Sequence, residues 1–177
     1  MNITQITDII NETKRIKTFI LDLEVKAIPG QFGMLWIPGV DEKPMSLSYT
    51  NGNMGVTILK LGPFSQKMHE LKIGDRIGVR GPLGRGYKVI GDKLLIVGGG
   101  VGIAPLAPLV ENALEAGKGI TAIIGAMTSE ELLFEKRMKK AGAEVLVATD
   151  DGTAGHKGFT TDIMREILKK ETFDQCF

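Results

Sequence analysis

The sequence is poor in the residues that form disulfide bonds or cysteine-ligated metal centres. Its 177 residues include one cysteine, Cys176, and two histidines, His69 and His156. One cysteine excludes an internal disulfide and any all-cysteine zinc or iron–sulfur site formed by this chain alone. Because the two histidines are far apart and have no companion ligands, we expect no metal site.

A charge excess of either sign and a long apolar run are also missing. The 22 basic and 21 acidic residues are spread along the chain and leave a formal charge of +1, so no basic stripe suggests a nucleic-acid partner. No apolar run is long enough to span a bilayer, and residues 1–17 lack the apolar centre of a signal peptide. We therefore expect a globular, cytoplasmic protein whose function depends on local sites.

The first half of the chain has the pattern of an all-β domain. Short apolar runs alternate with turn signals such as Pro29-Gly30, Pro38-Gly39 and Asn51-Gly52-Asn53. This spacing predicts an antiparallel barrel or sandwich. One short helix is expected over residues 65–71, where Ser65 has the chemistry of an N-cap.

From residue 93 onward the pattern changes to strands that alternate with helices. We expect strands at 94–97, 120–124 and 144–148 and helices at 104–116, 129–141 and 160–169. This alternation predicts a parallel sheet. The boundary is expected near Gly91-Asp92, which gives domains of residues 1–90 and 91–177.

A glycine-rich turn, residues 98–106, follows the first strand of the expected parallel sheet. Glycine lets a backbone approach a pyrophosphate closely, and the N–H groups at the start of the next helix attract an anion. The turn does not match the usual dinucleotide fingerprint, because Ile103 and Pro105 occupy the two possible positions of its third glycine. The alternative is a tight strand-to-helix connection with Pro105 in the first helical turn.

The β-rich half contains two further candidates for anion binding. In an extended strand, Lys43 and Met45 face one way while Pro44 and Ser46 face the other. This strand can offer a cation to a diphosphate and a hydroxyl to a ring nitrogen. The segment Gly62-Pro63-Phe64-Ser65 opens the short helix and supplies a second site for an anion. Taken alone, each segment is also compatible with an ordinary turn.

Five segments, taken together and in this order, resemble the ferredoxin-reductase-like flavoproteins. They are residues 43–46, 62–65, 81–86, 98–106 and 149–152. Within that group the chain is most similar to the electron-transfer subunits of type B dihydroorotate dehydrogenases. The resemblance implies a two-domain fold, with an antiparallel Greek-key β-barrel that binds FAD followed by a Rossmann-like α/β parallel sheet that binds NAD(H).

The resemblance also assigns residues to the two cofactors. Those implied to contact FAD are Lys43, Pro44, Met45, Ser46, Ile58, Leu59, Lys60, Gly62, Phe64 and Ser65. Those implied to contact NAD are Gly99, Gly100, Gly102, Ile103, Gly125, Thr149 and Asp150. No residue is expected to act as a general acid or base, because the hydride chemistry belongs to the cofactors.

The sequence departs from the family pattern in two places. Lys43 stands where the family usually has arginine, and a lysine cannot make a bidentate contact to phosphate. The family also continues into a cysteine-rich segment that binds a [2Fe–2S] cluster, whereas this sequence stops at Phe177 and lacks those ligands. We therefore expect an NAD domain that is truncated at its C-terminal end, or a shortened relative.

The segment after the second strand of the parallel sheet bears on the choice of nicotinamide cofactor. It contains Glu130 and Glu131 and no cation before Lys136, which favours NAD over NADP. Asp150 and Asp151 are expected either to border the nicotinamide and its ribose or to form a plain Asp-Asp-Gly turn.

The function that the resemblance implies is FAD-dependent electron transfer between NAD(H) and a partner. That partner is a flavoprotein subunit that oxidises dihydroorotate in pyrimidine biosynthesis. The first alternative is the electron-transfer subunit of another NAD(P)H oxidoreductase, of the sulfhydrogenase or ferredoxin:NAD(P) oxidoreductase type. The second is a non-catalytic remnant that binds a nucleotide or a partner.

Overall fold

The computed structural model describes all residues from 1 to 177. They form two compact units, Met1–Tyr87 and Lys88–Phe177. The change of pattern near Gly91-Asp92 thus falls inside the second unit, shortly after its start.

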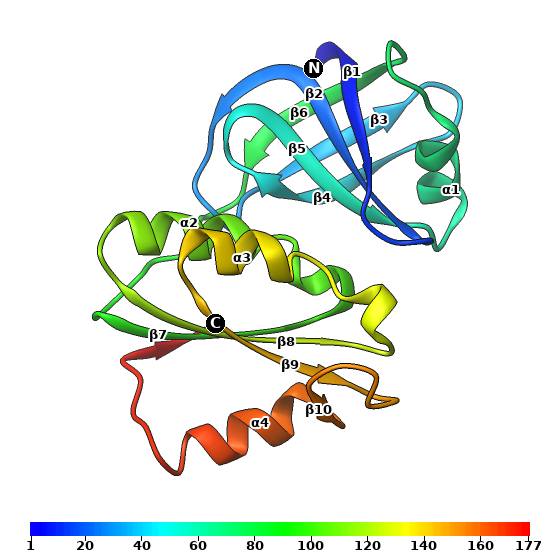
Figure 1. Cartoon of the computed structure of the whole chain (residues 1–177). Coiled ribbons are helices and arrows are strands. Elements are labelled where there is room, and N and C mark those ends of the chain that lie inside the picture. Colours follow the sequence, from blue (N-terminus) through cyan, green and yellow to red (C-terminus); the bar gives the residue numbers. More distant parts are fainter. The chain divides into compact units, whose positions relative to one another are not determined.

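The first unit is a closed barrel of six antiparallel strands (Figure 1), and the predicted antiparallel barrel is confirmed. The strands are β1 (Asn2–Asn11), β2 (Ile16–Lys26), β3 (Phe32–Ile37), β4 (Asp41–Tyr49), β5 (Asn51–Leu59) and β6 (Arg76–Leu83). They follow the order β1-β2-β5-β4-β3-β6 around the barrel, so β5 lies between β2 and β4 rather than at the end of a meander.

Alternating apolar residues fill the barrel. The fully enclosed side chains include Phe19, Leu21, Leu35, Leu47 and Val56, each 0% exposed. Burying a side chain of this size stabilises the fold by about 1.5–3 kcal/mol relative to leaving it in water. Residues next to them in each strand therefore face outward, and the candidate flavin residues Pro44 and Ser46 lie on the outer face of β4.

Helix α1 (Pro63–Glu70) begins earlier than expected, with Gly62 as its N-cap and a proline in its first turn. Ser65, which we expected to be the N-cap, is the third residue of the helix. Its Oγ still accepts the N–H groups of Leu61 and Gly62, both at 2.9 Å. The serine therefore caps the helix from inside, because proline already fits the first helical position.

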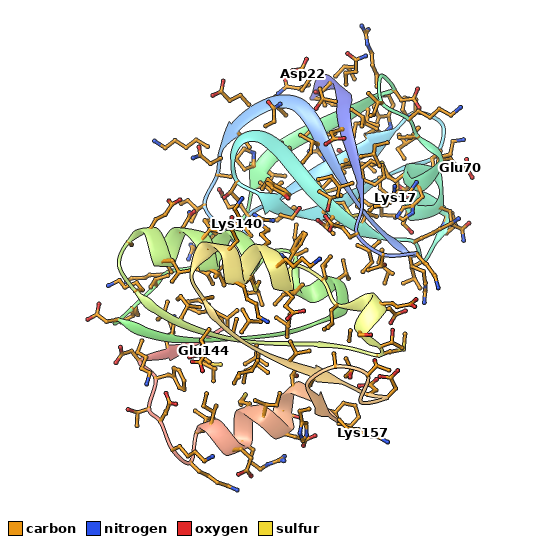
Figure 2. All side chains as sticks on the ribbon, in the orientation of Figure 1. Lys17, Asp22, Glu70, Lys140, Glu144 and Lys157 are labelled. Atoms are coloured by element: carbon orange, nitrogen blue, oxygen red, sulfur yellow. The ribbon has the colours of Figure 1, made fainter.

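Two contacts attach α1 to the barrel wall. The Nε2 atom of His69 lies 2.9 Å from the carbonyl oxygen of Ile58 in β5. Lys17 of β2 donates its ammonium to the carbonyl oxygen of His69 at 3.1 Å, and Figure 2 shows Lys17 beside the helix that ends at Glu70. These contacts hold the C-terminal end of α1 against β2 and β5.

The second unit is a parallel sheet with helices on both faces, as the strand–helix alternation predicted. The sheet order is β10-β9-β8-β7-β11. The strands are β7 (Lys93–Gly99), β8 (Gly119–Ala126), β9 (Glu144–Thr149), β10 (His156–Lys157) and β11 (Gln175–Cys176). In Figure 1, α2 (Ala107–Glu115) and α3 (Glu135–Ala141) cover one face and α4 (Thr160–Ile167) covers the other.

Two predicted helices differ from the structure: the helix predicted over 104–116 starts late, and the helix predicted over 129–141 is divided. Residues 100–103 form the short 3-10 turn η1 (Gly100–Ile103), and α2 starts only at Ala107, beside Pro108. Residues 129–141 are divided into η2 (Ser129–Glu131) and α3, because Phe134 takes a left-handed conformation with φ of 61°. Burial of the Phe134 ring offsets that strain, since only 8% of it is exposed.

The same interruption places a strong ion pair between α3 and α2. Arg137 donates from Nε and Nη2 to the two carboxylate oxygens of Glu111, both at 2.7 Å. Its guanidinium also lies 4.9 Å from the centre of the Phe134 ring. None of the helices combines the length and the apolar character that crossing a bilayer requires.

Candidate functional site

The outer face of β4 presents the hydroxyl that we expected to face a flavin ring. In the pairing of β3 with β4, Ser46 lies opposite Phe32 and Pro44 lies opposite Met34. Ser46 and Pro44 are exposed, whereas Met45 packs against the barrel core. The predicted alternation therefore holds for Pro44, Met45 and Ser46, whereas Lys43 is exposed as well. Ser46 is accessible to a ligand on the outer face.

Lys43 is not a free cation. Its Nζ lies 2.6 Å from Asp41 Oδ2, and the contact lowers the pKa of Asp41 below the ordinary aspartate value. Both side chains are about half exposed, so the pair is weak and another anion can compete for the lysine. A phosphate at Lys43 would have to replace Asp41 as its partner. Lysine also cannot make the bidentate contact to phosphate that arginine makes.

The start of α1 is better arranged for an anion. The first α1 amide to bond backward is that of Gln66, which donates to the carbonyl oxygen of Gly62 at 2.8 Å. The amides of Phe64 and Ser65 therefore have no partner within the helix. A Cβ placed on Gly62 would meet nothing within 4 Å, and the exposed Lys60 precedes this turn. This open helix start fits one diphosphate group of FAD.

Three predicted FAD residues point their side chains away from any ligand. Ile58 and Phe64 are 2% and 5% exposed and belong to the barrel core, and Ser65 is 8% exposed and uses its hydroxyl as a helix cap. These residues can contribute to a flavin site through their backbone atoms. Leu59 is half-buried on the outer side of β5.

The glycines at the end of β7 and in η1 divide into two groups. A Cβ on Gly98 would lie 2.8 Å from Ile103 Cδ1 and 3.2 Å from Leu106 Cδ1, so this glycine is needed for packing. A Cβ on Gly100 or Gly102 would meet nothing within 4 Å, and one on Gly99 would meet only a carbonyl oxygen at 3.9 Å. Three glycines therefore border open space at the start of η1, as a pyrophosphate cradle requires.

Other predicted NAD residues have roles in packing. A Cβ on Gly125 would lie 2.6 Å from Thr160 Cγ2, so this glycine lets the start of α4 approach β8. Ile103 is 1% exposed, so its side chain is unavailable to a ligand. Thr149 is fully buried, and its hydroxyl bonds to the backbone of Ala154 at 2.8 and 3.0 Å.

The loop after β9 is tied to the loop after β8. The amides of Asp150 and Asp151 donate to the carbonyl oxygens of Ala126 and Met127, both at 3.2 Å. Asp151 accepts the hydroxyl and the amide of Thr153, and these bonds lower the pKa of Asp151. Asp151 is thus part of a turn, whereas the carboxylate of Asp150 is exposed at the carboxyl end of the sheet, where ligands of open α/β sheets bind.

A row of hydroxyl groups on the barrel was not predicted from the sequence. Thr18 Oγ1 lies 2.7 Å from Glu12 Oε1 and 2.8 Å from Thr57 Oγ1, which in turn lies 2.8 Å from Ser48 Oγ. Threonines in strands are common, and only the pairing of Thr18 with Thr57 across β2 and β5 reveals the row.

The residues present do not fit an iron–sulfur cluster. Cys176 is the single cysteine, and no group of three or more His, Cys, Asp or Glu side chains is placed to hold a metal ion.

The comparisons with known proteins agree on one family, although no protein-family model matches the chain. A protein of Methanocaldococcus jannaschii is 50% identical over 172 residues, which are 97% of this chain and 65% of the relative. A protein of Methanothermobacter thermautotrophicus is 41% identical over 99% of this chain and 68% of the relative. Both bear the name "Probable dihydroorotate dehydrogenase B (NAD(+)), electron transfer subunit".

Solved structures share the fold of the whole chain. An NADH-dependent reduced ferredoxin-NADP oxidoreductase chain matches with a TM-score of 0.86 and 29% identity, over 99% of this chain and 67% of that one. The flavohem-like FAD/NAD-binding domain of a Vibrio cholerae nitric oxide dioxygenase matches with a TM-score of 0.77 and 18% identity, over 95% of this chain and 91% of that one.

The closed barrel, the parallel sheet and the open glycine turn define an FAD- and NAD-binding reductase fold of the ferredoxin-reductase type. Within that class, the chain belongs to the family of dihydroorotate dehydrogenase B electron transfer subunits. It spans about two thirds of the length of the curated relatives it matches, 65% and 66% for two of them.

Proposed function

We propose that this chain binds FAD on its barrel and NAD(H) on its parallel sheet, and that it passes electrons between NAD(H) and a partner subunit that oxidises dihydroorotate. FAD supplies the chemistry, because it takes up a hydride and can release electrons one at a time. The protein supplies binding and orientation. This role places the chain in the cytoplasm, in pyrimidine biosynthesis.

The open space above Gly99, Gly100 and Gly102 is the observation that carries the proposal. Glycine is needed at Gly98 for packing, but packing gives no reason for glycine at Gly102. A bound pyrophosphate gives one, since a side chain there would occupy the volume of the anion. Asp150 and the backbone at Gly125 and Thr149 lie at the carboxyl ends of the neighbouring strands, where the rest of the nucleotide would extend.

On the barrel, Ser46 would orient the flavin ring through its exposed hydroxyl. Lys60 and the amides of Phe64 and Ser65 would hold the diphosphate, with Lys43 joining when it leaves Asp41. We assign NAD(H) rather than NADP(H), because Glu130 and Glu131 in η2 would repel a 2′-phosphate.

The identity of the electron partner rests on the names of the relatives. In the alternative, this chain is the electron-transfer subunit of another NAD(P)H oxidoreductase and has a different partner. The 29% identity to the ferredoxin-NADP oxidoreductase chain favours this alternative. Coexpression with candidate dihydroorotate-oxidising subunits distinguishes the two. Dihydroorotate-dependent reduction of NAD by the resulting complex supports the first reading, and reduction of ferredoxin by NADH supports the second.

Spectroscopy of the purified chain tests the cofactor assignment. We expect a yellow protein whose flavin absorbance is bleached by NADH under anaerobic conditions, and bleached much less by NADPH. A colourless protein that cannot be reconstituted with FAD would contradict the proposal and leave a non-catalytic nucleotide-binding remnant.

The variant Ser46→Ala tests the orienting residue. Its hydroxyl is exposed and makes no contact that stabilises the fold, so we expect unchanged folding and FAD content with slower bleaching by NADH. Equal bleaching rates in Ser46→Ala and the parent protein would remove Ser46 from the mechanism.

A further inference from the structure

The loops after β8 and β9 leave the parallel sheet at the same edge. β8 pairs with β9 up to Ala126 and Thr149, and β7 pairs with β8 up to Gly99 and Gly125. The three strands are parallel, so they end together beside the glycines to which the proposed function assigns NAD(H). A contact that joins the two loops therefore shapes the surface on which the nucleotide would lie.

The loop after β9 is anchored to a buried residue of the sheet. Thr149 is 0% exposed, and its hydroxyl donates to the carbonyl oxygen of Ala154 at 2.8 Å and accepts the Ala154 amide at 3.0 Å. The carbonyl oxygen of Thr149 accepts the amides of Gly152 and Gly158 at 3.1 and 3.0 Å. This loop therefore has a fixed position relative to the sheet.

Thr153 joins this fixed loop to the loop after β8. The amide of Ser129 donates to Thr153 Oγ1 at 2.8 Å, and Thr153 Oγ1 lies 2.7 Å from Asp151 Oδ1. Because an amide N–H can only donate, the hydroxyl accepts from Ser129 and gives its single proton to Asp151. The bonds from Thr153 lower the pKa of Asp151, so this acceptor is a carboxylate at neutral pH. The direction of both hydrogen bonds is thereby determined.

The start of η2 depends on this contact for its cap. Ser129 is the first residue of η2, and the side chain of the N-cap residue Thr128 makes no capping hydrogen bond. The first amides of a helical turn have no partner inside it, and Thr153 supplies the acceptor that an N-cap usually supplies. Leu133 and Phe134, 3% and 8% exposed, anchor the chain just after η2. Thr153 therefore fixes the end of η2 that follows β8.

We propose that Thr153 is a positioning residue for the choice of nicotinamide cofactor, an inference that rests on the proposed function. Its hydroxyl holds η2 in place, and η2 carries the carboxylates of Glu130 and Glu131. A carboxylate held after the second strand accepts a hydrogen bond from the ribose 2′-hydroxyl of NAD and repels the 2′-phosphate of NADP. When η2 is released, the carboxylates lose the first contact and can withdraw from the second.

The variant Thr153→Val tests this role, because valine has nearly the shape of threonine and Thr153 is exposed. Calorimetric titration with NAD+ and NADP+, which cannot reduce the flavin, gives the two dissociation constants. One hydrogen bond of this kind changes a local equilibrium roughly 2- to 12-fold, so the preference for NAD+ over NADP+ should fall at least about fivefold. The rate of flavin bleaching at saturating NADH should stay unchanged, because the 2′ position is remote from the nicotinamide.

Two variants serve as controls. Thr153→Ser keeps the hydroxyl and should retain the preference of the parent protein. Thr172→Val removes the hydroxyl of another exposed threonine, which precedes β11 and so lies at the opposite edge of the sheet, and it should also match the parent. If Thr153→Val binds both cofactors with the ratio of the parent protein, Thr153 has no part in the choice of cofactor.

A second readout needs no cofactor, so it separates failure of this inference from failure of the proposed function. In amide hydrogen exchange followed by NMR, the Ser129 amide should exchange at least about fivefold faster in Thr153→Val than in the parent protein or Thr153→Ser. Equal exchange in Thr153→Val and the parent would show that Thr153 does not hold η2, and the inference would be wrong. A parent protein that binds neither NAD+ nor NADP+ would refute the proposed function, and the role of Thr153 in cofactor choice with it.

Discussion

Replacing Gly98, near the end of β7, and Gly102, in η1, by alanine should have opposite effects on stability. Gly98→Ala puts a methyl group 2.8 Å from Ile103 Cδ1 and 3.4 Å from Ile103 Cα. Ile103 is 1% exposed and cannot move aside freely. Gly102→Ala puts a methyl group into open space, at a residue without a positive φ.

The sizes of these effects follow from the contacts. Overpacking by one methyl group in a filled site costs about 1–3 kcal/mol, so Gly98→Ala should lower the unfolding free energy by that amount. Gly102→Ala should leave it unchanged or raise it by about 0.4–1 kcal/mol, because alanine restricts the unfolded chain. For NADH the order reverses, and Gly102→Ala should weaken binding at least about tenfold, equivalent to 1.4 kcal/mol.

Urea unfolding and NADH titration of the same preparations check both effects. The flavin spectrum serves as an internal control, since the barrel is a separate unit and should keep its FAD in both variants. If Gly102→Ala binds NADH as tightly as the parent protein, the turn after β7 is not a dinucleotide cradle. If Gly98→Ala is as stable as the parent, the division of the glycines into packing and ligand groups is wrong.

Four further substitutions test which contacts stabilise each unit by itself. Arg137→Ala removes a bidentate pair in which the arginine side chain is 15% exposed, and it should lower the unfolding free energy by about 1–2 kcal/mol in urea. Arg165, whose side chain is 66% exposed, is the control, and Arg165→Ala should change this free energy by less than about 0.5 kcal/mol. Equal costs would show that the Glu111 contact adds nothing. Burial lowers the pKa of His69 below 6.5, so the unfolded chain binds a proton more readily and stability should fall as the pH drops below about 6.5. His69→Gln should flatten that part of the profile of urea midpoint against pH, and an unchanged slope would assign the effect to other groups. Ser65→Ala removes the acceptor of two hydrogen bonds from backbone N–H groups and should cost about 1 kcal/mol of barrel stability, measured by thermal unfolding. An unchanged melting temperature would mean that water replaces the cap.

Much of the fold follows from local patterns in the sequence. Runs such as Phe19 to Leu21 are short and are separated by glycine and proline turns, which predicts antiparallel strands whatever their order around the barrel. From Leu94 onward the alternation of strands and helices predicts a parallel sheet for the same reason. The left-handed Phe134 was not predictable, because its strain is offset only by the burial of its ring and by contact with Arg137.

The sequence by itself determined the class of site, because a run of glycines between a strand and a helix has few uses other than close approach to a backbone or a phosphate. It could not separate Gly98, which packs against Ile103, from Gly102, which borders open space, since that difference depends on side chains several residues away. Nor could it join Glu12, Thr18, Thr57 and Ser48, which are spread over three strands and the turn after β1. Strand register alone brought their oxygens to within hydrogen-bonding distance, and register is a property of the folded barrel.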